Sequence, residues 1–148
     1  MHRIILGVLA IGLFLTVRAQ QPYRWAFTAK KTADKTYAIH LTAAIDNGWH
    51  TYSQTTPDGG PLPTKITFGK NPLVTRVGNV EELGKMEKYH EAVFDVDVKR
   101  YSDKVDFVQV VKLKAAVKTR LNGTVEFMVC NDHECLPPKT LPFSIAIN

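Results

Sequence analysis

The sequence predicts an all-β protein, an antiparallel β-sandwich of immunoglobulin-like topology. Apolar and polar side chains alternate in several short runs, which is the period of a strand with one buried face. Gly, Pro, Asn and Asp residues separate these runs, and no stretch shows the apolar stripe of an amphipathic helix. Several short strands with regular turn signals are typical of a sandwich, and an immunoglobulin-like topology is favoured over a closed barrel.

The clearest strand is residues 36–45, where apolar and polar positions alternate along the whole run. Asp46, Asn47 and Gly48 then supply a turn, because Asn and Gly tolerate a positive φ. Residues 49–54 resume as a strand. These two runs are the first pair of strands that the sequence predicts.

Three further strands are predicted, over residues 94–99, 125–130 and 141–147, again from alternation of apolar and polar side chains. Asn122-Gly123 is interpreted as a hairpin turn before the second of these. Residues 55–64 form a loop rich in Pro and Gly, and residues 69–90 are mixed. Within that mixed stretch, residues 80–88 are the one candidate for a helical turn.

Composition places few limits on function. The 148 residues are 45% hydrophobic and 22% charged, which excludes collagen-like, low-complexity and wholly disordered chains. The formal charge is +5, from 19 Lys and Arg against 14 Asp and Glu. No basic run is interleaved with aromatic residues, so nothing supports a nucleic-acid partner.

Residues 1–19 are predicted to be a signal peptide. A short basic start precedes the apolar residues 4–15, and Val17 and Ala19 stand where a signal peptidase inspects its substrate. As a helix the apolar run would span roughly 18 Å, less than the ~30 Å of a bilayer core, which disfavours the alternative of a retained anchor. We expect residues 20–148 to be a single periplasmic or secreted domain without a transmembrane segment.

The chemistry is expected from two cysteines, Cys130 and Cys135, which are followed by Pro137-Pro138. An exported chain meets an oxidising compartment, so a pair this close should be able to form a disulfide. One interpretation is a structural staple. In the loop-entropy model, closing a ring of roughly six residues stabilises the fold by only about 2 kcal/mol, so this disulfide would be a weak structural staple.

A second interpretation is a zinc or monovalent copper site built from Cys130, His133 and Cys135, with His50 or His90 as a distant ligand. This spacing is not a usual zinc pattern, and no metal or other cofactor is therefore predicted.

A third interpretation is a redox-active dithiol, because a local, accessible bridge suits attack by an incoming thiolate. Asp132 and Glu134 would raise the pKa of a neighbouring thiol and a charged His133 would lower it. The residues alone leave the reactivity of the pair undecided.

Residues 130–138 (CNDHECLPP), followed by a final strand, resemble the active-site hairpin of the amino-terminal periplasmic domain of DsbD-type thiol:disulfide interchange proteins. Residues 48–54 (GWHTYSQ) are similar to the aromatic strand of that family. The Pro- and Gly-rich residues 55–64 and residues 89–98 (YHEAVFDVDV) also look like it. The resemblance covers residues 20–148.

The resemblance implies an immunoglobulin-like domain whose cysteine pair relays electrons between thioredoxin-fold proteins. Its acceptors would be periplasmic disulfide isomerases and cytochrome c maturation factors. Cys135 would attack the partner's disulfide and Cys130 would resolve the mixed disulfide. A loop with an aromatic residue would shield the pair, and Tyr89 and His90 fall in that region.

Two departures from the family pattern bear on these expectations. The full-length family has a membrane domain and a carboxy-terminal thioredoxin-like domain, and this chain shows neither. We therefore expect a membrane-embedded electron donor or a separate thioredoxin-like domain as partner. The two cysteines are also separated by four residues, slightly fewer than in the best-known members.

Other side chains are candidates for modulating or shielding the pair. His133 lies inside the motif. Trp49 and Tyr52 belong to the aromatic strand, but alternation sends them to opposite faces, so they should not share a role. His50 and His90 could tune thiol ionisation, although solvated surface histidines are the favoured interpretation. The alternative function is a non-catalytic binding module in which the disulfide is a passive staple.

Overall fold

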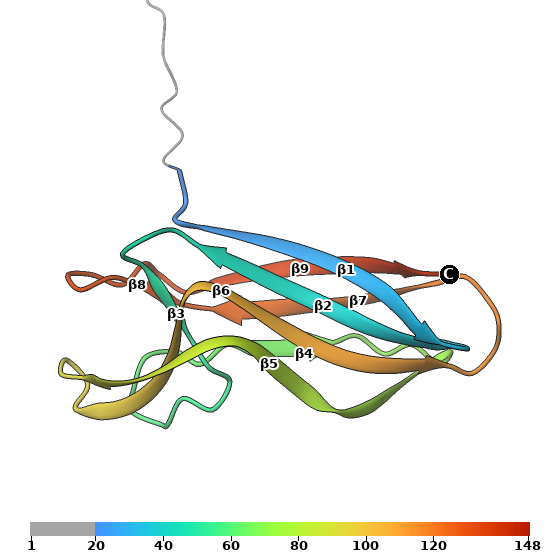
Figure 1. Cartoon of the computed structure of the whole chain (residues 1–148), viewed down its shortest axis with the longest axis horizontal. Helices are drawn as coiled ribbons and strands as arrows, with labels where there is room; N and C mark the ends of the chain where they lie inside the picture. Colours follow the sequence, from blue (N-terminus) through green and yellow to red (C-terminus); the bar gives the residue numbers. More distant parts are fainter. Residues whose placement is uncertain (1–19) are drawn as a thin grey trace, which may run out of the picture.

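The structure is a computed structural model that describes residues 20–148, a range made of strands and loops (Figure 1). The predicted signal peptide, residues 1–19, lies outside the described residues. Within residues 20–148, no helix is long and apolar enough to cross a membrane. The nine strands of this range are β1 (Tyr23–Ala33), β2 (Thr36–Ile45), β3 (His50–Tyr52), β4 (Lys65–Phe68), β5 (Val74–Glu91), β6 (Val96–Leu113), β7 (Thr119–Phe127), β8 (Val129–Cys130) and β9 (Lys139–Ile147).

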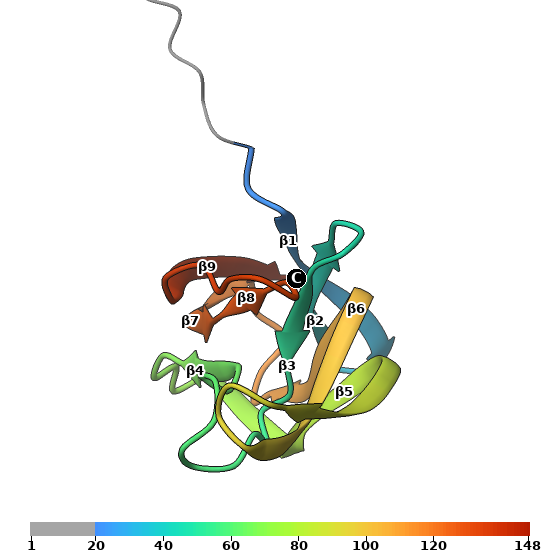
Figure 2. The same ribbon diagram turned by 90° about the vertical axis from the view of Figure 1, so that its left-hand side faces the viewer.

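Two antiparallel sheets pack face to face, as Figures 1 and 2 show. The larger sheet has the order β1-β2-β6-β3-β8, with β5 paired to the other edge of β6, and the smaller sheet has the order β4-β7-β9. Strand β6 is the centre of the larger sheet, because its residues 104–112 pair with β2 and its residues 100–102 pair with β3. This architecture confirms the predicted all-β, immunoglobulin-like sandwich.

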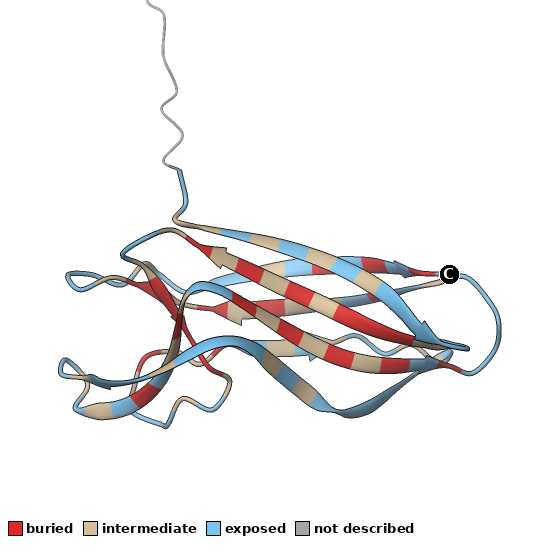
Figure 3. Ribbon diagram, in the orientation of Figure 1, coloured by how far each residue is buried: buried red, intermediate tan, exposed pale blue. Residues whose placement is uncertain are grey.

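The main core lies between the sheets and is built from alternate residues of the strands (Figure 3). On β2, Ile39, Leu41 and Ala43 are fully buried, whereas His40 and Thr42 between them are half-buried. Burying one such aliphatic side chain stabilises the fold by about 1.5–3 kcal/mol. The remaining strands supply further buried core residues, including Val105, Phe107, Leu121, Val125, Phe127, Phe143 and Ile145.

Strand β1 was not among the predicted strands. It pairs with β2 along its whole length and turns Trp25 and Phe27 toward the core. The Trp25 ring centroid lies 5.9 Å from that of Phe107 and 5.1 Å from that of Phe127. These aromatic contacts hold β1 over an edge of the core.

The predicted helical turn at residues 80–88 is wrong, since this stretch lies within β5 and pairs with β6. Pairing with β6, the next strand along the chain, outweighs local propensity here. Leu83 and Met86 remain 53% and 40% exposed, so β5 has no buried apolar stripe that a sequence pattern could reveal. The predicted strand at residues 49–54 is present, but only as His50–Tyr52.

The predicted hairpin turn at Asn122-Gly123 is also wrong, because both residues lie inside β7. Gly123 is directly opposite Phe143 on β9. A Cβ atom on Gly123 would collide with the Phe143 ring and with the carbonyl oxygen of Thr67 on β4. The glycine is therefore needed for close packing in the middle of a sheet rather than for a turn.

A second, smaller cluster of buried residues lies at the end of the sandwich where β3, β8 and the β5–β6 hairpin converge (Figure 1). Tyr52, Val98 and Cys130 are its buried members, and Val96 and Met128 pack against them. One of the two cysteines is therefore part of a hydrophobic cluster that is separate from the main core.

Candidate active site

Cys130 and Cys135 form a disulfide, and their Cα atoms are 4.0 Å apart. Cys130 is the last residue of β8 and is only 1% exposed, whereas Cys135 is exposed. Two backbone hydrogen bonds close a hairpin around the pair: the Asn131 N–H donates to Glu134 O, and the Leu136 N–H donates to Val129 O, both over 2.9 Å. We call residues 129–136 the cysteine hairpin.

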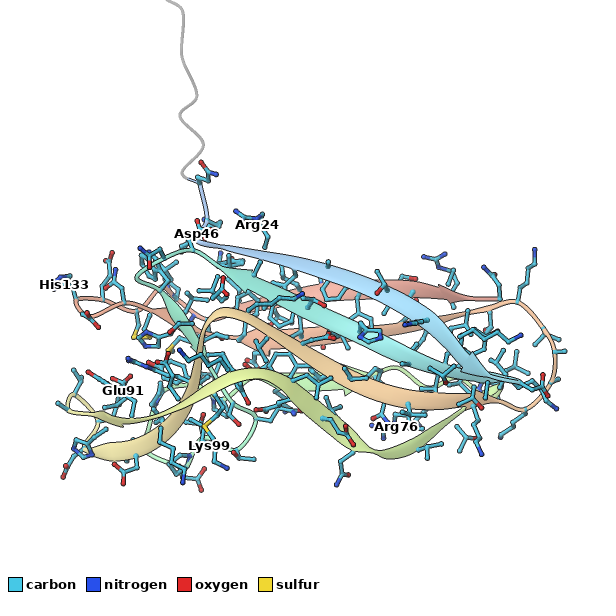
Figure 4. All side chains as sticks on the ribbon, in the orientation of Figure 1. Arg24, Asp46, Arg76, Glu91, Lys99 and His133 are labelled. Carbon is cyan, nitrogen blue, oxygen red and sulfur yellow. A yellow bond between two sulfur atoms is a disulfide. The ribbon has the colours of Figure 1, made fainter. Side chains whose placement is uncertain are left out.

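Asn131 shapes the turn of the cysteine hairpin. Its side-chain Oδ1 accepts hydrogen bonds from the backbone N–H groups of His133 and Glu134, over 2.8 and 2.7 Å. Asn favours such turns because its side chain bonds its own backbone two residues on. Asp132, His133 and Glu134 are consequently exposed, and Figure 4 shows His133 at the tip.

Strand β3 places His50 directly opposite Cys130 and Tyr52 directly opposite Arg100. Residues opposite one another in an antiparallel pair project to the same face of the sheet. His50 and Tyr52 are 4% and 0% exposed, so the interpretation of His50 as a solvated surface histidine is wrong. Trp49 packs against the main core, on the other face, as strand alternation predicts.

A buried polar network lies beside the cysteine pair. The Tyr52 hydroxyl donates to Glu91 Oε1 over 3.0 Å, and His50 Nε2 is 3.0 Å from the Tyr52 hydroxyl oxygen. His50 Nε2 is also 3.5 Å from Glu91 Oε1. Burial lowers the pKa of His50, and burial together with the nearby Glu91 carboxylate raises the pKa of Tyr52. Both side chains are therefore neutral near neutral pH.

Arg100 connects this network to β5. Its Nη1 atom is 3.9 Å from Glu91 Oε1, its Nε atom is 3.3 Å from Glu87 Oε2, and its guanidinium lies over the Tyr89 ring. Glu91 is the last residue of β5 and is labelled in Figure 4. Acidic and basic groups from two strands thus meet behind the disulfide.

A pocket of about 480 Å³ separates the cysteine hairpin from the turn between β5 and β6. We call this turn, residues 92–95, the cap turn. Phe94 of the cap turn is half-buried, and Val93 is 88% exposed. The pocket is lined by His50, Tyr89, Glu91, Ala92, Val93, Phe94, Arg100, Cys130, Asn131, Asp132, His133, Glu134 and Cys135.

The two residues predicted to lie in a shielding loop have separate positions. Tyr89 lines the pocket, whereas His90 lies outside it and contacts Asp97 and Asp95, with nitrogen–oxygen distances of 2.8 and 3.3 Å. Phe94 is the aromatic residue of the cap turn and lines the pocket together with the cysteine pair, although its alternation with Val96 predicted that it lies in a strand.

Among residues 20–148, no group of three or more His, Cys, Asp or Glu side chains is placed to hold a metal ion. Both sulfur atoms are used in the disulfide, so they are not free as thiolate ligands in this form. The arrangement instead suits sulfur chemistry. One sulfur-bearing residue is accessible, its partner is buried, and ionisable groups lie alongside.

Residues 16–146 match the protein family described as "Thiol:disulfide interchange protein DsbD, N-terminal". The chain belongs to this family. The resemblance carried by the cysteine motif and the aromatic strand is thereby confirmed. A search of curated proteins found no match.

Solved structures of the DsbD N-terminal type share the fold. The N-terminal periplasmic domain of ScsB from Proteus mirabilis is 18% identical with a TM-score of 0.52, and the match covers 84% of this chain and 44% of that chain. The reduced DsbD N-terminal domain from Neisseria meningitidis is 17% identical with a TM-score of 0.52, covering 78% and 80%. A complex of the DsbD and PilB N-terminal domains from Neisseria meningitidis matches at 11% identity and a TM-score of 0.50, covering 88% and 87%.

Proposed function

We propose that this chain is a periplasmic thiol–disulfide exchange domain that relays electrons between thioredoxin-fold proteins through Cys130 and Cys135. The observation that carries the proposal is the asymmetry of the disulfide, with Cys135 exposed in a turn and Cys130 buried beside it. An accessible sulfur can be reached by another protein, and a buried neighbour can complete the exchange without dissociating. Membership of the DsbD N-terminal family supports the same role.

The reaction has two steps. In the dithiol form, the Cys135 thiolate attacks one sulfur of the partner's disulfide. That S–S bond breaks, a mixed disulfide forms, and the partner's other sulfur leaves as a thiolate. The Cys130 thiolate then attacks the Cys135 sulfur and expels the partner's second thiolate. Two electrons and two protons pass to the partner, and the domain is left with its own disulfide.

The electron donor would reverse these steps on the oxidised domain. We propose a membrane-embedded protein or a separate thioredoxin-like domain as donor, and a soluble thioredoxin-fold protein as acceptor. Residues 1–19 would direct the chain to the periplasm or outside the cell, where such exchange takes place. In the DsbD–PilB pair from Neisseria meningitidis, an N-terminal domain of this family is in a complex with another domain, which supports exchange between proteins.

The reduction potential of the pair tests the proposal directly. Residues 20–148 would be equilibrated with a dithiothreitol or glutathione series, and free thiols would be trapped and counted. A potential of roughly −270 to −180 mV, the range between thioredoxin and disulfide isomerase, is expected for a relay. A potential well below about −300 mV would mark a structural bridge, and the binding-module function would then replace this one.

Single-cysteine variants assign the two roles. In Cys130→Ser the remaining Cys135 thiolate should attack a single-cysteine thioredoxin whose cysteine carries a thionitrobenzoate group, which forms the mixed disulfide and releases the coloured thionitrobenzoate anion. In Cys135→Ser the remaining Cys130 should form it much more slowly, because it is buried. Equal reactivity in the two variants would contradict the assignment, and unimpaired electron exchange in both would end the relay proposal.

A further inference from the structure

His50 is the cross-strand neighbour of Cys130. The two residues are opposite one another in the β3–β8 ladder, so their Cβ atoms are about 4.5–5.5 Å apart on one face of the sheet. Both residues are buried, and both line the pocket that contains the disulfide. An imidazole is thus the ionisable side chain that the strand pairing places directly beside the buried cysteine.

The hydrogen bonds of the network determine which imidazole nitrogen is basic. The Tyr52 hydroxyl has one proton, and it donates this proton to Glu91 Oε1. The contact of 3.0 Å between His50 Nε2 and the Tyr52 oxygen must therefore have Nε2–H as donor. A neutral imidazole with its proton on Nε2 carries its lone pair on Nδ1, which is free to accept a proton.

The charged groups that act on His50 come from β5, β6 and the cysteine hairpin. Arg100 on β6 and burial both disfavour the imidazolium, whereas Glu91 and Glu87 on β5 and Asp132 in the cysteine hairpin favour it. Burial and Arg100 have the larger effect, so the pKa of His50 is lowered and its imidazole is neutral before the reaction. Glu91, only 3.5 Å from Nε2, would stabilise the cation once a proton arrives.

The buried thiol of Cys130 needs such a base. Burial disfavours a thiolate, so the position of Cys130 in a hydrophobic cluster works against loss of its proton in the reduced form. Cys130 must lose its proton before it can attack the mixed disulfide. His50 is neutral, adjacent to Cys130, and bonded through Nε2 to a tyrosine that is in turn bonded to a carboxylate.

We propose that His50 is the general base that removes the Cys130 proton in the resolving step of thiol–disulfide exchange. The proton moves from the Cys130 sulfur to Nδ1 of His50, and the Cys130 thiolate attacks the Cys135 sulfur. The S–S bond between Cys135 and the partner breaks, and its electron pair leaves with the partner's sulfur. The imidazolium releases its proton to solvent, from which the partner's thiolate takes one. Tyr52 and Glu91 are positioning residues that hold the tautomer.

The resolving step can be isolated with an aryl disulfide reagent, dithiobis(nitrobenzoate), and the reduced domain. Cys135 attacks the reagent and releases one coloured thiolate at a rate proportional to reagent concentration. Cys130 then displaces a second coloured thiolate at a rate independent of that concentration. Because a positioned general base contributes typically 10²–10⁴-fold, His50→Gln should slow the second phase at least about tenfold at pH 7. The first phase should keep its rate.

The pH profile separates a base from a packing residue. In the parent, the second phase should reach a plateau once His50 is neutral. In His50→Gln it should rise in proportion to hydroxide, because solvent must then remove the proton. His40→Gln is the matched control, since His40 is a half-buried histidine on β2 that hydrogen-bonds Asp106 outside the pocket. It should match the parent in both phases.

A second measurement does not depend on the variant folding. Nitrogen chemical shifts of the His50 imidazole in the parent should show the tautomer protonated at Nε2, and Tyr52→Phe should weaken that preference. A parent tautomer protonated at Nδ1, or a His50→Gln variant with the parent's second-phase rate and pH profile, would overturn the proposal.

This inference rests on the proposed function but fails separately from it. Should the parent show both phases with the reagent yet fail to reduce any thioredoxin, the relay would be lost and the base assignment would stand. Should His50→Gln reduce thioredoxin with the parent's pH profile, the base assignment would be lost and the relay would stand.

Discussion

The guanidinium of Arg100 lies over the ring of Tyr89, with its Cζ atom 3.5 Å from the ring centroid. The same guanidinium pairs with Glu87 through Nε, and Arg100 is directly opposite Glu87 in the β5–β6 ladder. Glu87 and Tyr89, like the third partner Glu91, belong to the part of β5 that leads into the cap turn. Arg100 therefore fixes the base of the hairpin whose tip faces the cysteine pair.

Replacing Arg100 with Gln should loosen the cap turn. The variant loses the cation over Tyr89 and the ion pair with Glu87, and we expect about 1–2 kcal/mol of lost stability. Dithiothreitol should reduce the disulfide faster, since the turn that covers it is less restrained. Denaturant unfolding and the reduction rate measure the two effects. Arg120→Gln, on β7 and bonded to Ser144, is the control for reduction. An unchanged reduction rate in Arg100→Gln would show that Arg100 has no part in shielding.

Phe94 provides a direct test of shielding. It is half-buried and lines the same pocket as Cys135. Phe94→Ala should speed the reaction of the disulfide with small thiols several-fold, while the reduction potential stays near that of the parent. Val117→Ala, which removes a 40% exposed side chain outside the pocket, is the matched control. If Phe94→Ala and Val117→Ala reacted at the same rate, the cap turn would not limit access.

Glu82 on β5 binds Ser53 and Gln54, which connect β3 to the Pro- and Gly-rich loop. Its Oε1 atom accepts hydrogen bonds from the Gln54 N–H over 2.7 Å and from the Ser53 hydroxyl over 3.1 Å, and its Oε2 atom accepts one from the Tyr101 hydroxyl over 2.6 Å. Glu82→Gln keeps the shape of the side chain but replaces one acceptor oxygen with an NH2 group, which cannot accept a hydrogen bond from these donors. We therefore expect the unfolding free energy to fall by about 1–3 kcal/mol. Urea unfolding measures it, with Glu81→Gln on the exposed side as control. A loss no greater than that of Glu81→Gln would mean that the loop is held by other contacts.

The strands that a sequence pattern predicts are those with one buried face. Strand β2 alternates fully buried with half-buried residues, and its bounds match the prediction. Strand β5 is an edge strand with exposed residues on both sides, and its pairing with β6 shifts register twice. Because its conformation depends on that partner, no local pattern could reveal it.

The same distinction applies to the site. The cysteine pair, Tyr52 and the exposed His133 follow from a local motif and from strand alternation. No sequence motif or alternation pattern pointed to Glu91 and Arg100, because their position behind the disulfide results from the register of β5 on β6. A histidine opposite a cysteine becomes visible only once β3 is known to lie between β6 and β8.

Gly123 shows why a turn motif can mislead. Asn-Gly is a strong hairpin signal, yet here the glycine lies under the Phe143 ring in the middle of β7. Gly123→Ala should lower stability by about 1–3 kcal/mol, because the added methyl overpacks against Phe143 and the backbone of Thr67. Thermal or urea unfolding checks this. A neutral or stabilising result would show that β4 and β9 can move apart without cost.

The last prediction concerns the pH dependence of the hairpin that carries the cap turn. His90 contacts Asp97 and Asp95 across the base of the turn, and its hydrogen bond with Asp97 raises the pKa of His90 above the ordinary 6.5. A group whose pKa is raised by folding stabilises the fold fully below its unfolded pKa, and this contribution is lost as the pH rises through the folded pKa. The stability difference between the parent and His90→Gln should therefore be largest below pH 6.5 and should shrink as the pH rises above that value. Proton NMR titration of His90 gives its pKa, and melting temperatures of both proteins across this range give the difference. A pKa at or below 6.5, or a difference that does not change with pH, would contradict the prediction.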